Sequence, residues 1–107
     1  MTPTDVTDAT FDAEVLQSEV PVVVDFWADW CQPCKRMSPI LEEVAAEQGD
    51  RIKVVKLDTD ANPSSTMKYR ITGIPAFKVF RGGQEIGEIV GAMPKPAFEQ
   101  RLNALLG

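Results

Sequence analysis

Cys31 and Cys34 are the only thiols in this 107-residue sequence, which contains no histidine. The absence of histidine excludes Ser-His-Asp and Cys-His nucleophile pairs, imidazole metal ligands and histidine pH switches. Any chemistry in this chain must therefore use thiols, carboxylates or amines. The C-x-x-C spacing makes the cysteine pair the first candidate site.

Four interpretations of the cysteine pair compete. A structural zinc site would have only two of its four ligands, and a second subunit would have to supply the others. Haem attachment requires C-x-x-C-H, but Lys35 follows Cys34. A purely structural disulfide across so short a loop would contribute only about 2 kcal/mol. The fourth interpretation, a redox-active dithiol, explains more of the sequence.

The position of the pair, at the start of a predicted helix, favours redox chemistry. Residues three apart on an α-helix have Cα atoms about 5 Å apart, which a disulfide accepts. The helix N-terminus, together with Lys35 and Arg36, is expected to lower the pKa of Cys31. We expect Cys31 to be exposed and Cys34 to be more buried. Cys31 would then attack a substrate disulfide, and Cys34 would resolve the mixed disulfide.

The elements that must position the cysteines alternate between strands and helices. Residues 22–28 form an apolar run typical of a central strand, and apolar periodicity predicts a helix from about Cys34 to Gln48, stopped by Gly49. Further strands are predicted near Asp5-Val6 and at 52–57, 76–80 and 85–90. Three further helices are predicted: one through Phe11, Val15 and Leu16, a short one that begins with Asn62 as N-cap and Pro63 as its first residue, and one from Lys95-Pro96 to the C-terminus. The paired glycines of 81–84 predict a hairpin, and the strand-helix-strand order predicts a right-handed parallel crossover. The order βαβαβαββα predicts an α/β fold with a mixed sheet of about five strands and four helices.

Composition and charge limit the remaining possibilities. The 11 Lys and Arg against 16 Asp and Glu give a net charge of −5, and 44% of the residues are hydrophobic. This length and composition predict a single domain spanning 1–107. No apolar stretch approaches the roughly 20 residues of a membrane span, and no signal-peptide pattern follows Met1, so we expect a soluble, cytoplasmic protein. The acidic balance argues against nucleic acid as a partner.

Asp25 is unusual because it interrupts the apolar central strand, where a charge is costly to bury. One hypothesis is a structural ion pair with Lys56, which is itself unusual within its predicted strand. The other is that burial raises the pKa of Asp25, so that the carboxylate can accept and return the proton of Cys34. In that case Asp25, helped by Lys56, is the candidate for moving the proton.

The segment Phe26-Trp27-Ala28-Asp29-Trp30-Cys31-Gln32-Pro33-Cys34-Lys35, followed by Gly73-Ile74-Pro75 and Gly91-Ala92, resembles the thioredoxin family. The resemblance covers nearly the whole chain. It implies a thioredoxin fold and a protein-disulfide reductase whose only redox group is the Cys31–Cys34 disulfide, with no bound cofactor. It also favours the proton-accepting role of Asp25 over a structural ion pair.

Further site residues follow from the same resemblance. It implies a cis bond between Ile74 and Pro75 facing the cysteines. It implies a substrate platform around Cys31, made by Trp30, Gly73, Ile74, Pro75, Gly91 and Ala92. Gln32 and Pro33 would tune the redox potential, since they lie between the cysteines. Two residues depart from the family pattern, because Gln32 replaces a common Gly and Ala76 replaces the Thr that often follows the cis proline.

The resemblance also implies partners for an electron carrier. Thioredoxin reductase would recharge the dithiol with electrons from NADPH, which this chain would use only indirectly. Expected clients are ribonucleotide reductase, methionine sulfoxide reductase and peroxiredoxins, and we expect a monomer. Two alternatives remain: an oxidising disulfide exchanger, disfavoured by the missing export signal, and a non-catalytic module whose cysteines hold an intersubunit metal or cluster.

Overall fold

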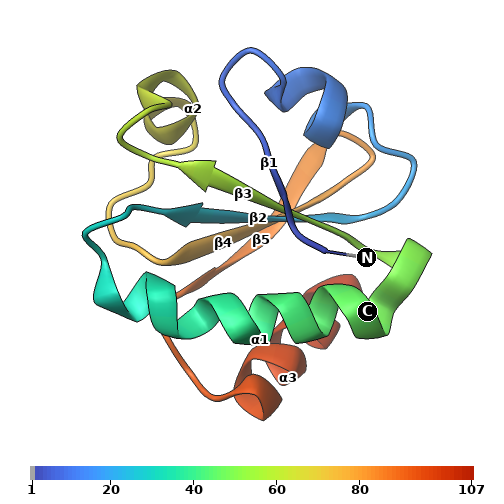
Figure 1. The fold of residues 1–107 in the computed structure, drawn as a ribbon. Coiled ribbons are helices and arrows are strands. Elements are labelled where there is room, and N and C mark those ends of the chain that lie inside the picture. The colour runs from blue at the N-terminus through green and yellow to red at the C-terminus, as the bar shows by residue number, and fades with distance from the viewer. Residues whose placement is uncertain (1) are drawn as a thin grey trace.

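Five strands form one mixed sheet with helices against both faces (Figure 1). The computed structural model describes residues 2–107. The elements along the chain are β1 (Thr4–Asp5), η1 (Asp12–Leu16), β2 (Val22–Trp27), α1 (Gln32–Gln48), η2 (Gly49–Arg51), β3 (Lys53–Asp58), α2 (Pro63–Lys68), β4 (Ala76–Arg81), β5 (Gln84–Val90) and α3 (Lys95–Leu106). The predicted order βαβαβαββα is confirmed. The first helix, η1, is a π-helix, and a short 3-10 helix, η2, follows α1.

The sheet order is β1-β3-β2-β4-β5, with β2 at the centre. β3 pairs in parallel with β1 and β2, whereas β4 pairs antiparallel with β2 and β5. β2 and β3 therefore end at the same edge of the sheet, at the left of Figure 1. Side chains that follow these two strands are brought together at that edge, which is a common place for sites in open α/β sheets.

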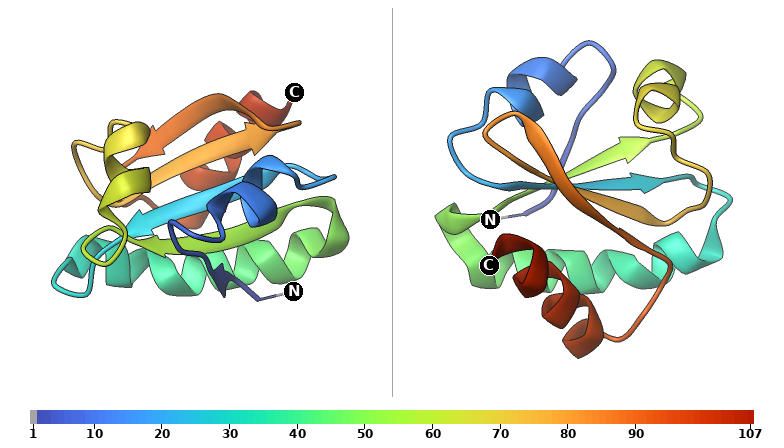
Figure 2. Two further views of the ribbon diagram at one scale, coloured as in Figure 1. Left: turned by 90° about the horizontal axis from the view of Figure 1, so that it is seen from above. Right: turned by 180° about the vertical axis from the view of Figure 1, so that it is seen from behind.

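Two hydrophobic layers cover the two faces of the sheet. α1 and α3 pack against one face, and η1 and α2 lie on the other, as the views in Figure 2 also show. Alternation along β2 places Val23 and Asp25 on the face covered by α1, and Val24 and Phe26 on the opposite face. Asp25 and the sheet-facing side of α1, which includes Cys34, thus share one layer.

The boundaries of α1 and of the hairpin follow from local chemistry. α1 begins at Gln32, two residues before the predicted start, because Cys31 occupies the N-cap position. It ends at Gly49, as predicted, and the φ of 57° there favours glycine. Gly82 and Gly83, with φ values of 60° and 80°, form the two-residue turn between β4 and β5.

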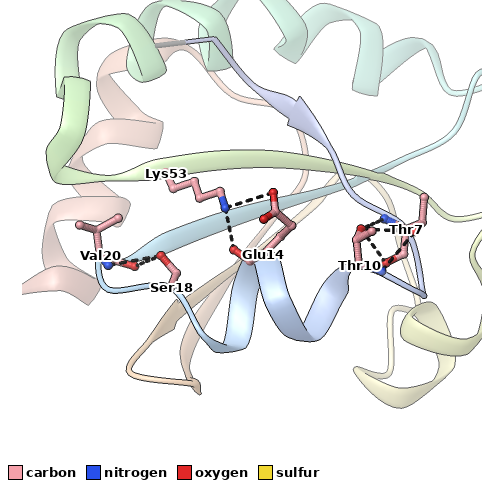
Figure 3. A network of polar contacts seen from close by, with 6 residues as sticks. All are labelled: Thr7, Thr10, Glu14, Ser18, Val20 and Lys53. Atoms are coloured by element: carbon pink, nitrogen blue, oxygen red, sulfur yellow. Dashed lines mark hydrogen bonds and ion pairs between the residues drawn. The ribbon is translucent and has the colours of Figure 1, made fainter.

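The N-terminal segment is tied to the sheet by polar contacts (Figure 3). The ammonium group of Lys53 on β3 donates a hydrogen bond to the backbone oxygen of Glu14 (2.9 Å) and lies 3.4 Å from its carboxylate. Thr7 and Thr10 close a small turn, in which the backbone N–H of Thr7 donates to the hydroxyl of Thr10 at 2.9 Å. These contacts fix η1 and the turn before it against β3.

The cap of α2 differs from the prediction. Asn62 occupies the N-cap position, but its side chain makes no capping hydrogen bond. The carboxylate of Asp8, from the N-terminal segment, instead accepts hydrogen bonds from the backbone N–H groups of Ser64 (3.2 Å) and Ser65 (2.8 Å). The prediction of a side-chain cap by Asn62 is therefore wrong, because a residue 54 positions away satisfies these donors and leaves the amide free for other bonds.

Among the described residues, no helix is long and apolar enough to span a membrane.

Candidate active site

The cysteine pair lies where β2 ends and α1 begins (Figure 1). Cys31 and Cys34 form a disulfide, and their Cα atoms are 5.3 Å apart, close to the separation expected from the helical spacing. The sulfur of Cys31 accepts a hydrogen bond from the backbone N–H of Cys34 at 3.2 Å. The N–H of Cys31 donates to the carbonyl of Ala28 at 3.0 Å, which fixes the loop between strand and helix. A sulfur is thus held at a helix N-terminus, where a thiolate is stabilised.

Both cysteines are buried in the oxidised state. Cys31 is 4% exposed and Cys34 is 2% exposed, so the prediction of an exposed Cys31 is wrong for this state. In this state Cys31 is bonded to Cys34 and packs against Ala28, Trp27 and Ile74. The predicted low pKa of Cys31 concerns the reduced thiol and stays a prediction.

The two cations after the pair behave differently. Lys35 lies 3.9 Å from the carboxylate of Asp29, and both side chains are well exposed, so this contact stabilises the loop little. Arg36 is also exposed, and it forms no ion pair within residues 2–107. Arg36 lines a cavity beside α1 together with Met37 and Ala92.

Asp25 is 1% exposed, and its Oδ1 atom has no hydrogen-bond partner. Burial raises the pKa of Asp25 to about 7, and the charge of Lys56 partly offsets this rise. A buried carboxyl with such a pKa exchanges a proton near neutral pH. Its position on the face covered by α1 places it in the same layer as Cys34.

Lys56 is the neighbour of Asp25 in the parallel register of β2 and β3. The hypothesis of a direct ion pair between them is wrong, because the described residues show no such contact. The ammonium group lies 4.6 Å from the ring centroid of Trp27, where the π-face attracts it. Trp27 is half-buried, and its indole N–H is buried without a partner among the described residues. Lys56 therefore acts on Asp25 through its field rather than through a hydrogen bond.

The residues expected to form a substrate platform surround the cysteines in part. The Ile74–Pro75 bond is cis, as predicted, and Ile74 packs against the layer that contains both cysteines. The backbone N–H of Gly91 donates to the carbonyl of Pro75 at 2.8 Å and joins two of the expected segments. Gly73 and Ala92 are exposed. Gln32 is exposed between the cysteines, and Pro33 is half-buried.

Trp30 forms one wall of a groove beside the disulfide. Its ring is 67% exposed, yet its Nε1 donates to the carboxylate of Asp60 at 2.9 Å. The adjacent cavity has a volume of about 310 Å³ and is lined by Trp30, Thr59, Thr66, Ile71, Thr72, Gly73 and Ile74. We call this cavity the Trp30 groove. Sequence reasoning missed Asp60, Thr59 and Thr66, since no local pattern relates them to a tryptophan about thirty residues earlier.

The site is built for thiol chemistry. Within residues 2–107, no three His, Cys, Asp or Glu side chains lie together in a way that could hold a metal ion. The site combines a disulfide at a helix N-terminus, a buried carboxyl with a raised pKa and an apolar groove next to the sulfurs. These features are those of a dithiol–disulfide oxidoreductase.

Comparison with known proteins identifies the family. The sequence model of the thioredoxin family matches residues 2–104. The chain is 48% identical over 98 residues to Thioredoxin 1 of Synechococcus elongatus, covering 92% of each chain, and 50% identical over 97 residues to Thioredoxin 1 of a Nostoc species, covering 91% of each. It is also 48% identical over 99 residues to the bifunctional thioredoxin reductase/thioredoxin of Mycobacterium leprae, of which it covers 22%. The chain belongs to the thioredoxin family, has the thioredoxin fold and is a protein-disulfide reductase with a redox-active cysteine pair.

Proposed function

We propose that Cys31 is the nucleophile and Cys34 the resolving thiol of an electron carrier that reduces protein disulfides. In the reduced protein, the Cys31 thiolate attacks one sulfur of a substrate disulfide. A mixed disulfide forms, the substrate S–S bond breaks, and the departing thiolate takes up a proton. Cys34, as its thiolate, then attacks the sulfur of Cys31, so that the Cys31–Cys34 bond forms and the second substrate thiol leaves. Two electrons pass to the substrate, and the carrier is left oxidised.

The observation that carries this assignment is the N-cap position of Cys31, whose sulfur accepts the N–H of Cys34. The same N–H and the positive end of α1 would stabilise a thiolate at Cys31. Cys34 lies inside the first turn and is slightly more buried, which suits the thiol that attacks second.

Asp25 takes the proton of Cys34 in the resolving step. Its pKa of about 7 means that it exists in both protonation states near neutral pH, as a general base requires. Lys56 assists because its charge counteracts the effect of burial on Asp25. Asp25→Asn should slow disulfide reduction most at neutral pH. An unchanged pH–rate profile would exclude this role.

The substrate chain binds over a partly exposed platform next to the cysteines, where it enters the Trp30 groove. The platform consists of Trp30, Gly73, Ile74, Pro75, Gly91 and Ala92. Its exposed indole and glycine backbone suit an extended peptide, which needs apolar contact and close approach. Gln32 and Pro33, between the cysteines, tune the redox potential.

The cellular role follows from the family. Thioredoxins are generally reduced by thioredoxin reductase, and in the Mycobacterium leprae relative the two names are joined in one protein. We assign this chain a thioredoxin reductase as electron donor, with NADPH as the indirect source, and no bound cofactor of its own. Its clients would be ribonucleotide reductase, methionine sulfoxide reductase and peroxiredoxins. The chain would act as one domain over 1–107, as a cytoplasmic monomer that binds neither nucleic acid nor membranes.

One set of measurements tests the assignment. A redox titration against dithiothreitol should give a strongly reducing couple, and insulin reduction should be lost in Cys31→Ser. Cys34→Ser should retain the first attack and accumulate partner proteins bound covalently at Cys31. Trapping at Cys34 in the Cys31→Ser variant instead would reverse the order of attack.

A further inference from the structure

Asn62, at the start of α2, is a buried amide that joins three segments of the chain. It is 6% exposed. Its Oδ1 accepts the backbone N–H of Asp8 at 2.8 Å, and its Nδ2 donates to the carbonyl of Asp58 at 3.0 Å. Its own carbonyl accepts the hydroxyl of Thr66 at 2.9 Å. A buried amide whose two ends are both hydrogen-bonded fixes the relative positions of its partners.

One chain of hydrogen bonds leads from Asn62 to Trp30. The carboxylate of Asp58 accepts the backbone N–H groups of Asp60 (2.9 Å) and Ala61 (3.3 Å), which closes the turn before Asn62. The carboxylate of Asp60 in turn accepts the indole N–H of Trp30 at 2.9 Å. Trp30 is largely exposed, and this hydrogen bond restrains its ring. The position of Asp60 therefore depends on the turn that Asn62 holds.

A second chain leads from Asn62 to the opposite wall of the Trp30 groove. Thr66 donates both its hydroxyl and its backbone N–H to the carbonyl of Asn62. The carbonyl of Thr66 then accepts the N–H of Ile71 at 3.1 Å. Thr66 and Ile71 line the groove with Trp30. Both chains therefore meet at Asn62, one through its side-chain amide and the other through its backbone carbonyl.

Asp8 anchors the same arrangement from the N-terminal segment. Its backbone N–H bonds to Asn62, and its carboxylate caps α2 at Ser64 and Ser65. Since Asp8 supplies the cap, the amide of Asn62 is available to hold Asp58. The turn closed by Thr7 holds Asp8 in place.

We propose that Asn62 and Asp8 are positioning residues for substrate recognition, which hold Trp30 and the Ile71–Ile74 segment at the spacing that a disulfide-bearing chain requires. They do so without touching the substrate. A groove that is already in its binding shape avoids the cost of ordering its walls when the substrate binds. The inference rests on the proposed function of the Trp30 groove as the substrate site.

The test compares a protein disulfide with a small one in the full-length chain. Asn62→Ala and Asp8→Ala should each raise the KM for insulin about 3- to 10-fold, the range expected for one lost hydrogen bond, with kcat unchanged. Reduction of 5,5′-dithiobis(2-nitrobenzoate), a small aromatic disulfide that does not need both walls, should proceed at the wild-type rate. The indole N–H resonance of Trp30 should shift in both variants. Matched controls are Asn103→Ala and Asp12→Ala. The exposed side chains of Asn103 and Asp12 make no hydrogen bond or ion pair within residues 2–107, so these variants should leave all four measurements unchanged.

The outcomes separate the inference from the function on which it rests. If Asn62→Ala fails to fold, Asp8→Ala alone decides, because Asp8 is exposed to solvent on one side and only its capping carboxylate is removed. A wild-type KM in the folded variants, or equal losses with insulin and the small disulfide, overturns the inference. Trp30→Ala is the reference: if it leaves the KM for insulin unchanged, the proposed substrate groove itself is wrong. If Trp30→Ala raises the KM while Asn62→Ala and Asp8→Ala do not, only the positioning role is refuted.

Discussion

Asp25 and Asn62 are both buried polar residues near the active site, but their surroundings are opposite. Asp25 is 1% exposed, and one carboxylate oxygen has no partner, whereas Asn62 is 6% exposed and both ends of its amide are bonded. An unpaired buried polar group costs stability, and a fully paired one specifies geometry. The unpaired carboxyl of Asp25 is therefore the group suited to chemistry, because it can gain or lose a proton without breaking a hydrogen bond at Oδ1.

The two residues also serve different layers. Asp25 lies on the sheet face that α1 covers, and Cys34 is one of the buried residues of α1. Asn62 lies where β3 leads into α2, on the way to the Trp30 groove. The disulfide lies between them at the shared edge of the sheet, where β2 enters α1. Under the proposed function, proton transfer and partner recognition would be supported from separate parts of the fold, and variants should affect them separately.

The largest expected effect is a stability gain from Asp25→Asn at high pH. Because burial raises the pKa of Asp25 from 3.8 to about 7, the folded protein holds this proton more tightly than the unfolded chain does. The stabilising effect of protonation is complete below about pH 4 and is lost as the pH rises to about 7, a loss of roughly 4 kcal/mol. Urea unfolding of the oxidised protein should show that Asp25→Asn is more stable than wild type at pH 9 and that the difference narrows towards pH 4.

The control for that measurement is Asp29→Asn. Asp29 is 91% exposed at its side chain and makes only a distant contact with Lys35, so its replacement should leave the pH dependence unchanged. If the difference in unfolding free energy between Asp25→Asn and wild type stays constant from pH 4 to pH 9, burial does not raise the pKa of Asp25, and the contrast with Asn62 disappears.

The second effect, in order of size, is a stability loss from Asn62→Ala. Removal of the amide leaves the N–H of Asp8 without its partner and takes one of two hydrogen bonds from the carbonyl of Asp58, which still accepts the backbone N–H of residue 62, at a cost of about 1–3 kcal/mol. Unlike the effect of Asp25, this loss should be equal at pH 5 and pH 9, because the amide does not titrate. Urea unfolding at both values checks it, with Asn103→Ala as the matched exposed asparagine. A loss that changes with pH would show that Asn62 acts through a titrating neighbour.

The sequence reveals Asp25 but not the role of Asn62, and the reason is physical. A carboxylate within a run of valines contradicts its surroundings, so Asp25 is visible from a few neighbouring residues. Asn62 before Pro63 fits the pattern of a helix N-cap, so the local sequence predicts that its side chain bonds to the start of α2, which it does not. Its actual partner, Asp8, is 54 positions away, and only the tertiary fold brings the two together.

The same distinction applies to the rest of the molecule. Strands, helices and the C-x-x-C pair follow from periodicity, glycine positions and local motifs, and the observed order of elements confirms them. The ion pair of Asp25 with Lys56 is wrong, although the two are register neighbours, because the flexible lysine side chain reaches the ring of Trp27 instead. The burial of Cys31 also differs from the prediction, since its neighbours Trp27, Ala28 and Ile74 cover it, and Ile74 comes from a segment far along the chain.

A smaller effect is expected from Lys56→Met, which keeps a side chain of similar length without the charge. The charge of Lys56 lowers the pKa of Asp25, so its removal should raise that pKa further. Titration of the Asp25 carboxyl by carbon NMR should therefore show a higher midpoint, and the decline of stability with rising pH should continue to a higher pH. Lys68→Met, an exposed cation on α2, is the control. An unchanged midpoint would mean that the cation near Trp27 is too far away or too well screened to act on Asp25.

The smallest effect belongs to Asp8 and has the opposite sign from that of Asp25. A hydrogen bond from the side chain of Ser65 is the main cause that holds the pKa of Asp8 below its usual range. The backbone N–H groups of Ser65 and Ser64 lower it further. The folded state thus favours the ionised carboxylate, so its contribution is present above the ordinary aspartate pKa and is lost as the pH falls through the lowered value. Asp8→Asn should reduce the stability slightly at neutral pH and make the loss between pH 5 and pH 2 less steep than in wild type. Thermal unfolding across that range measures the slope, and an identical slope in Asp8→Asn and wild type would contradict a charged cap and leave Asn62 as the sole anchor of the groove.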